Sequence, residues 1–131
     1  KVFSANLVSE PLLPLADHYG HTSGYQSEKM KLVPDIVPGK VLNVPVVVES
    51  PWTYELEVVR EIPWGESDVF LCKIRNVMTD GYYDDETIPF DERLRKASPV
   101  LTTRGTYYSL SGKNLGAWGT PQQSLRLPSA E

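Results

Sequence analysis

The sequence predicts a mainly β protein that forms one domain. Eleven prolines and nine glycines are spread along 131 residues, and they interrupt the chain too often for long helices. The short runs between them are rich in Val, Ile, Tyr, Trp and Thr, which favour strands. A chain of this length is large enough to bury one hydrophobic core.

The first forty residues predict a strand, one short helix and a long loop. Residues 1–7, KVFSANL, alternate apolar and polar side chains, as a half-buried strand does. Residues 9–20, SEPLLPLADHYG, place apolar side chains at helical spacing, with Pro14 limiting the helix to a short piece and Gly20 placed to stop it. Residues 21–40 are polar and irregular, and long loops in small domains often carry function.

The middle of the chain predicts strands. Residues 40–50 predict a strand with an edge or a bulge at Pro45, and residues 53–79 predict an antiparallel hairpin that turns at Gly65. Alternation places three residues of the first hairpin strand on a solvated face: Thr53, Glu55 and Glu57.

After the hairpin, residues 79–98 predict a polar excursion over the surface, and residues 99–110 predict a further strand. The stretch GTYYSLSGKNLGAWG, residues 105–119, combines aromatic side chains with glycines. Its aromatics either fill the core, or glycine turns send Trp118 away from it. The domain is expected over residues 1–119, followed by a loose tail over 120–131.

Charge and composition argue against several classes of partner. The net charge is -4, and Lys and Arg form no basic stripe, so nucleic acid and anionic membranes are poor partners. No apolar run approaches the length of about 18 residues that a membrane span needs, and no signal peptide is visible, so we expect a cytoplasmic protein. The single cysteine, Cys72, is expected to be a buried thiol.

The loop sequence HTSGYQSEK holds the residue types that bind phosphate. Thr22 and Ser23 supply hydroxyl donors, Gly24 can free backbone N–H groups, and Lys29 supplies a cation. The spacing is not that of a nucleotide-triphosphate loop, and a solvated loop is the alternative interpretation.

Other catalytic patterns are weak. His18 and His21 form an H-x-x-H pair, but no further His and no second Cys could complete a zinc site, so no metal site is expected. No serine nucleophile motif is present. The protein is therefore expected to be non-catalytic or to take its reactivity from a cofactor.

Five segments in order resemble the flavin reductase-like family of FMN-binding split barrels, and most closely its flavoredoxin-like branch. They cover about residues 2–119: ANLVSE, LADHYGHTSGYQSEKM, LNVPVVVESPWTYELEV, GESDVFLCKI and GTYYSLSGKNLGAWG. The resemblance implies an antiparallel split β-barrel, partial at its N-terminus, that forms a homodimer and binds FMN. It also implies electron transfer from NADH or NADPH.

The resemblance places Ser23, Gly24 and Lys29 in the flavin-proximal loop, with Thr22 and Ser23 as donors to the phosphate and Lys29 as its counter-charge. It also suggests that Trp118 lies at the dimer contact or near a neighbouring subunit's flavin. Three departures stand beside it: Ser67 and Tyr25 replace a family His and Arg, and relatives usually carry several strands before Val2. The alternative function is a non-catalytic β-barrel module for binding or dimerisation that has lost its flavin site.

Overall fold

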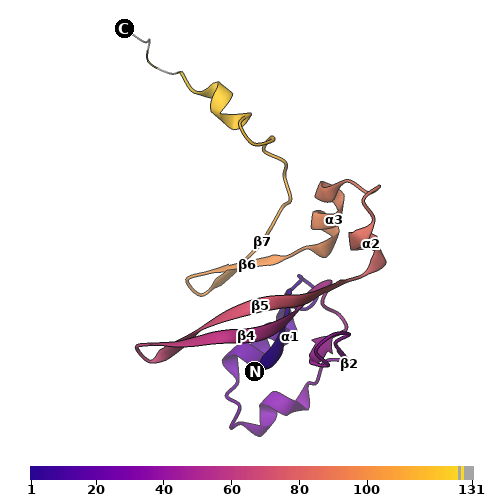
Figure 1. Ribbon diagram of the computed structural model, residues 1–131, viewed down its shortest axis with the longest axis vertical. Coiled ribbons are helices and arrows are strands. Elements are labelled where there is room, and N and C mark those ends of the chain that lie inside the picture. Colours follow the sequence, from indigo (N-terminus) through magenta and orange to yellow (C-terminus); the bar gives the residue numbers. More distant parts are fainter. Residues whose placement is uncertain (127, 129–131) are drawn as a thin grey trace.

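The computed structural model describes residues 1–126 and 128, and strands dominate it (Figure 1). In this part of the chain the strands form three antiparallel sheets. The largest sheet has the order β1-β4-β5, and the other two are the pairs β2-β3 and β6-β7. The strands are β1 (Val2–Asn6), β2 (Ile36–Pro38), β3 (Pro45–Val47), β4 (Trp52–Trp64), β5 (Ser67–Thr79), β6 (Val100–Thr103) and β7 (Thr106–Ser109). The described residues do not close into a barrel, so the split barrel stays a prediction.

The expectation of one short helix is wrong. The helices are α1 (Leu13–His21), α2 (Gly81–Asp84) and α3 (Phe90–Ala97), with 3-10 turns η1 (Ser27–Lys31) and η2 (Pro121–Ser124). The predicted helix corresponds to α1, which continues one residue beyond Gly20. The segment 79–98, expected to be a surface excursion, is largely exposed, but it contains the helices α2 and α3. In α3, acidic residues occupy the first turn and basic residues the last, which suits the helix dipole.

The predicted hairpin is confirmed. Strands β4 and β5 pair antiparallel from Trp52 with Thr79 to Trp64 with Ser67. Gly65 turns the chain between them with a φ of 62°, a left-handed conformation that glycine adopts at little cost. Strand β1 pairs with the other edge of β4.

The expectation that Thr53 and Glu55 face solvent is wrong. Their side chains are 1% and 0% exposed, respectively. Thr53 donates a hydrogen bond to Asn6 on β1, and the Glu55 carboxylate accepts hydrogen bonds from the loop between β2 and β3. Alternation correctly placed Thr53 and Glu55 on one face of β4. Near the start of β4, however, other parts of the chain cover this face.

The buried core is small. The buried apolar side chains of the described residues come from the residue before α1, the loop before β3, and β3, α2 and α3: Leu12, Val44, Val46, Tyr83 and Ala97. On β5, Phe70 and Leu71 are both exposed although consecutive side chains point to opposite faces, and Cys72 is half-buried rather than buried. Both faces of the β4-β5 hairpin are therefore exposed to solvent near Phe70 and Leu71 in the single chain.

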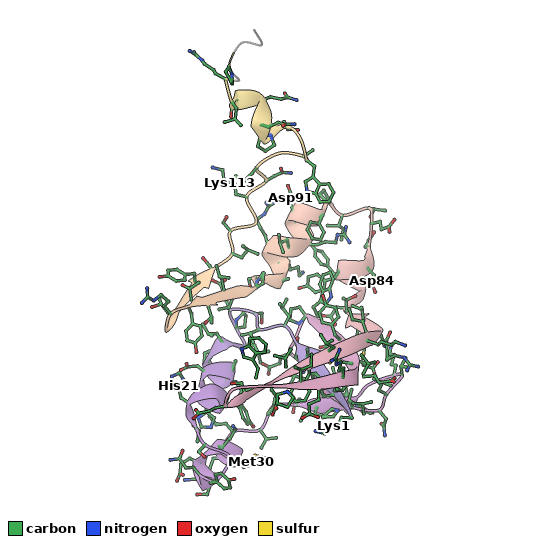
Figure 2. The ribbon with its side chains drawn as sticks, turned by 60° about the vertical axis from the view of Figure 1, so that its left-hand side comes forward. Lys1, His21, Met30, Asp84, Asp91 and Lys113 are labelled. Atoms are coloured by element: carbon green, nitrogen blue, oxygen red, sulfur yellow. The ribbon has the colours of Figure 1, made fainter. Side chains whose placement is uncertain are left out.

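The closing stretch does not fill the core. Strands β6 and β7 form a hairpin whose Tyr107 and Tyr108 are both exposed, and Trp118 is 104% exposed. After β7 the chain leaves the sheets and runs outward (Figures 1 and 2). Gly112 and Gly116 have positive φ angles, as the interpretation with Trp118 turned outward requires. Within residues 1–126 and 128, no helix is long and apolar enough to cross a membrane.

Candidate functional site

The predicted phosphate loop follows the last turn of α1. The backbone N–H of Thr22 donates to the His18 carbonyl at 3.0 Å and ends the helix. The Gln26 N–H then donates to the Ser23 carbonyl at 2.9 Å, and the Gln26 side chain accepts from the Ser23 N–H at 3.0 Å. These contacts fold residues 22–26 into a turn that leads into η1.

Turn η1 returns Lys29 to the side of α1. The Lys29 carbonyl oxygen lies 3.3 Å from His18 Nε2, and the Lys29 ammonium lies 5.7 Å from the centre of the Tyr19 ring. Among the described residues, no carboxylate forms an ion pair with Lys29. The cation is therefore available to an anionic ligand beside Tyr19.

Some of the hydrogen-bond donors around Lys29 already have acceptors within the chain. Ser23 Oγ accepts from the Tyr25 N–H at 3.3 Å, which leaves its own hydrogen free to donate. The N–H groups of Thr22 and Ser23 are both used within the turn. Because the C-terminal end of a helix carries partial negative charge, a phosphate placed here depends on the Lys29 cation.

Gly24 has no steric role in the loop. A Cβ at this position would meet nothing within 4 Å, so the turn does not require glycine for space. Tyr25, at the position of the family Arg, is 103% exposed. Ser67, at the position of the family His, begins β5 at the exposed end of the hairpin.

An apolar hollow adjoins the loop through Tyr19. Its volume is about 150 Å³, and α1, β1, β3 and Pro34 surround it. Its lining residues are Asn6, Val8, Leu12, Leu15, Ala16, Tyr19, Pro34 and Val47. Since Tyr19 borders both this hollow and Lys29, an apolar surface and a cation lie next to each other. A ligand with an aromatic ring and a phosphate matches this combination.

Trp118 does not join this cluster within one chain. In Figure 2, Lys113, five residues before Trp118, lies in the upper part of the view, and Met30, next to Lys29, lies near the bottom, so the two segments are far apart. The predicted contact of Trp118 with a flavin therefore requires a second copy of the chain and stays a prediction.

His18 and His21 lie in the last turn of α1. His21 Nδ1 lies 3.1 Å from Asp17 Oδ1, and the Tyr107 hydroxyl donates to the same oxygen at 2.6 Å. That hydrogen bond to Asp17 is the main reason why the pKa of Tyr107 is raised. Asp17 thus joins α1 to β7, and the described residues hold no cluster of three or more potential metal ligands.

Glu55 is the polar site that the sequence did not reveal. Its carboxylate accepts from the backbone N–H groups of Lys40, Val41 and Leu42, at 2.8 to 3.2 Å, and from Asn76 Nδ2 at 2.6 Å. Burial raises the pKa of Glu55, but these hydrogen bonds together outweigh burial and hold the pKa below its ordinary value. The adjacent PGK turn, which can expose N–H groups, was the only signal in the sequence.

Comparison with solved structures shows the same fold. A flavoredoxin from Methanosarcina acetivorans matches with a TM-score of 0.76 and 22% identity, covering 94% of this chain and 64% of that chain. Flavoredoxin of Desulfovibrio vulgaris (Miyazaki F) matches with a TM-score of 0.70 and 26% identity, covering 90% and 63%. An FMN-binding protein from Thermus thermophilus, with bound p-hydroxybenzaldehyde, matches with a TM-score of 0.68 and 19% identity, covering 88% and 61%.

The chain therefore spans a little under two thirds of the length of these structures. The search of curated proteins gave no match. The family model described as flavin reductase like domain matches residues 1–111, which is most of the chain. With this match, and with the flavoredoxin fold in the structure, the chain belongs to the flavin reductase-like family.

Proposed function

We propose that the protein is an FMN-binding oxidoreductase or electron-transfer protein that uses NADH or NADPH. The observation that carries the proposal is the family match over residues 1–111. The apolar hollow beside the Lys29 cation supports it, because FMN joins an aromatic ring system to a phosphate. A bound flavin accepts a hydride and passes on electrons.

The residues of the chain have separate roles in this proposal. Lys29 pairs with the phosphate, and the hydroxyls of Thr22 and Ser23 donate hydrogen bonds to it. The hollow along α1 covers part of the ring and excludes water from it. Gly24 lies in the turn between these donors and Lys29, where a Cβ would meet nothing within 4 Å.

One chain forms only part of a flavin site. The hollow of about 150 Å³ is smaller than the roughly 300–1,000 Å³ of typical ligand pockets. Over a third of the length of each flavoredoxin also lies outside its alignment with this chain. We therefore propose that a homodimer, or further strands of the same fold, completes the site.

Replacing Lys29 tests the phosphate role. Lys29→Gln should weaken FMN binding by about tenfold or more, because one charged hydrogen bond is worth about 1.5–3 kcal/mol. Riboflavin, which has no phosphate, should bind equally to the variant and the original protein. The measurement is a fluorescence titration with each flavin.

Lys31→Gln is the matched control for this titration. Lys31 lies on the same turn η1, but it pairs with Glu28 at 3.5 Å and should leave the affinity for FMN unchanged. An equal loss of FMN and riboflavin binding in Lys29→Gln would place the phosphate elsewhere. If the original chain does not bind FMN, the proposal that it is an FMN-binding protein is wrong.

The alternative is a non-catalytic β-barrel module that serves binding or dimerisation and has lost the flavin site. The exposed Tyr25 and Ser67 favour it, since both replace residues of the family pattern. It predicts no oxidation of NADH or NADPH with added FMN. Steady turnover above the rate of free FMN would exclude it.

A further inference from the structure

Residues 114–125 form an uncharged arm that makes few contacts with the rest of the described chain. The arm, residues 114–125, contains no Asp, Glu, Lys or Arg. Asn114 Nδ2 donates to Asp91 Oδ2 on α3 at 3.1 Å. Beyond that contact, the hydrogen bonds found for the described arm residues stay within the arm. Figure 1 shows the arm running away from all three sheets.

The arm is exposed although it is apolar. Leu115 is 76% exposed, Leu125 is 65% exposed, and Trp118 is 104% exposed. An uncharged segment with three large apolar side chains in water is unusual for a monomer, and such surfaces mark interaction sites. The aromatic and aliphatic side chains indicate a protein partner rather than a polyanion.

Part of the arm also aligns with a solved fold. The alignment with the Methanosarcina flavoredoxin covers 94% of the 131 residues, so it leaves out only about eight of them. Because the arm has twelve residues, at least part of it lies within the alignment.

A large apolar groove lies at the base of the arm. The α3 groove has a volume of about 730 Å³, and it is lined by Phe90, Asp91, Leu94 and residues 110–118. Phe90 is 56% exposed and Leu110 is 45% exposed, so the groove presents apolar side chains to water. Its lining includes the first part of the arm itself.

We propose that the arm of a second copy of this chain occupies the α3 groove, and that the two copies exchange arms around a twofold axis. Groove and arm are continuous and both apolar, so one surface supplies both halves of the contact, as a twofold interface requires. Together they involve roughly 20 residues on each copy, close to the 20–30 of a standard interface. The inference rests on the homodimer of the proposed function, but not on its flavin.

Sedimentation of arm variants tests the exchange. Trp118→Ala and Leu115→Lys should each raise the dissociation constant of the dimer by tenfold or more. Trp64→Ala is the matched control, because Trp64 is also exposed, at 74%, but lies at the end of the β4-β5 hairpin. The control should dimerise as the original chain does.

Disulfide trapping between different copies locates the contact. In a Cys72→Ser background, a copy with Phe90→Cys is mixed with a copy carrying Trp118→Cys and a tag of different mass. Oxidation should give a species with the combined mass. Trp64→Cys in place of Trp118→Cys should give none, and single-cysteine copies exclude a bond within one chain.

The outcomes separate this inference from the proposed function. A dimer that survives both arm variants, a wild-type chain that stays monomeric, or the absence of the mixed disulfide would each overturn the exchange. Trp118→Ala that weakens FMN binding without weakening the dimer would also overturn it and would assign Trp118 to the flavin. FMN titrations on the same samples report flavin binding independently of the arm.

Discussion

Glu55 shows how one buried side chain can hold a segment that has no regular structure of its own. Three consecutive backbone N–H groups and the Asn76 amide surround its carboxylate. Buried N–H groups are costly without acceptors, and this carboxylate supplies acceptors for all three. The loop between β2 and β3 is therefore fixed to β4 and β5 through one residue.

Glu55→Gln should lower the free energy of unfolding by about 1–3 kcal/mol, because an amide offers only one acceptor oxygen and turns N–H donors toward other donors. The lowered pKa of Glu55 has a second consequence. Its contribution is complete above its ordinary pKa of 4.5 and is lost as the pH falls below that value through the lowered pKa.

Urea denaturation at several pH values between neutral and acidic measures both effects. The acid loss of stability should be smaller in Glu55→Gln than in the original chain. Glu57→Gln is the control, because Glu57 pairs with Arg75 at the surface and surface pairs contribute little. Equal pH profiles in the original chain and Glu55→Gln would contradict this role for the carboxylate.

The sequence predicts a helix or strand well when residues close together in the sequence determine it. It predicts poorly what depends on contacts between distant residues. The β4-β5 hairpin and α1 follow from alternation, prolines and a turn glycine, which are local signals. The burial of Thr53 and Glu55 depends on Asn6 and on residues 40–42, which are distant in sequence. Ser23 and Lys29, which we propose bind phosphate, are near each other in the sequence, but the hollow beside them comes from four separate segments.

Helix α3 was missed although its signals were present. Acidic side chains begin it and basic side chains end it, but the polar composition of residues 79–98 outweighed that pattern. Burial of Ala97 against other segments stabilises a helix of only eight residues that would be marginal alone.

The base of the arm predicts different costs for two glycine substitutions. Gly112 has a φ of 66°, and a Cβ there would lie 2.9 Å from Arg95 Cγ on α3. Gly112→Ala should therefore lower the free energy of unfolding by about 1–2 kcal/mol. Gly24→Ala has open space and should change stability by less than about 0.5 kcal/mol.

Thermal and urea denaturation of the two variants measure this difference. Gly24→Ala should also bind FMN as the original chain does, since nothing in the loop requires a bare Cα. A cost for Gly24→Ala as large as that for Gly112→Ala would show that the loop is packed by another surface. An alanine would then be tolerated no better in the loop at position 24 than at position 112.

At the scale of the whole molecule, the buried core is small for the number of apolar side chains that remain exposed. Strand β5 is an edge strand of 13 residues, and free edges of that length readily pair with other strands. The chain should therefore associate in solution. Association couples to folding, because only folded chains present the matching surfaces.

The melting temperature should accordingly rise with protein concentration. Calorimetry over a hundredfold range of concentration checks this, with light scattering at the same concentrations to give the mass. A monomeric mass together with a constant melting temperature would contradict it. The same samples with added FMN show whether flavin and association stabilise the fold independently.

Gly39 and Glu55 compete for one volume. A Cβ on Gly39 would lie 2.2 Å from Glu55 Oε1, closer than two atoms without a bond can approach. Any side chain at position 39 must therefore displace the carboxylate, and the three N–H groups lose their acceptor at the same moment. The two positions should change only together, so Gly39→Ala and Glu55→Ala in one molecule should cost clearly less than the sum of the two separate changes.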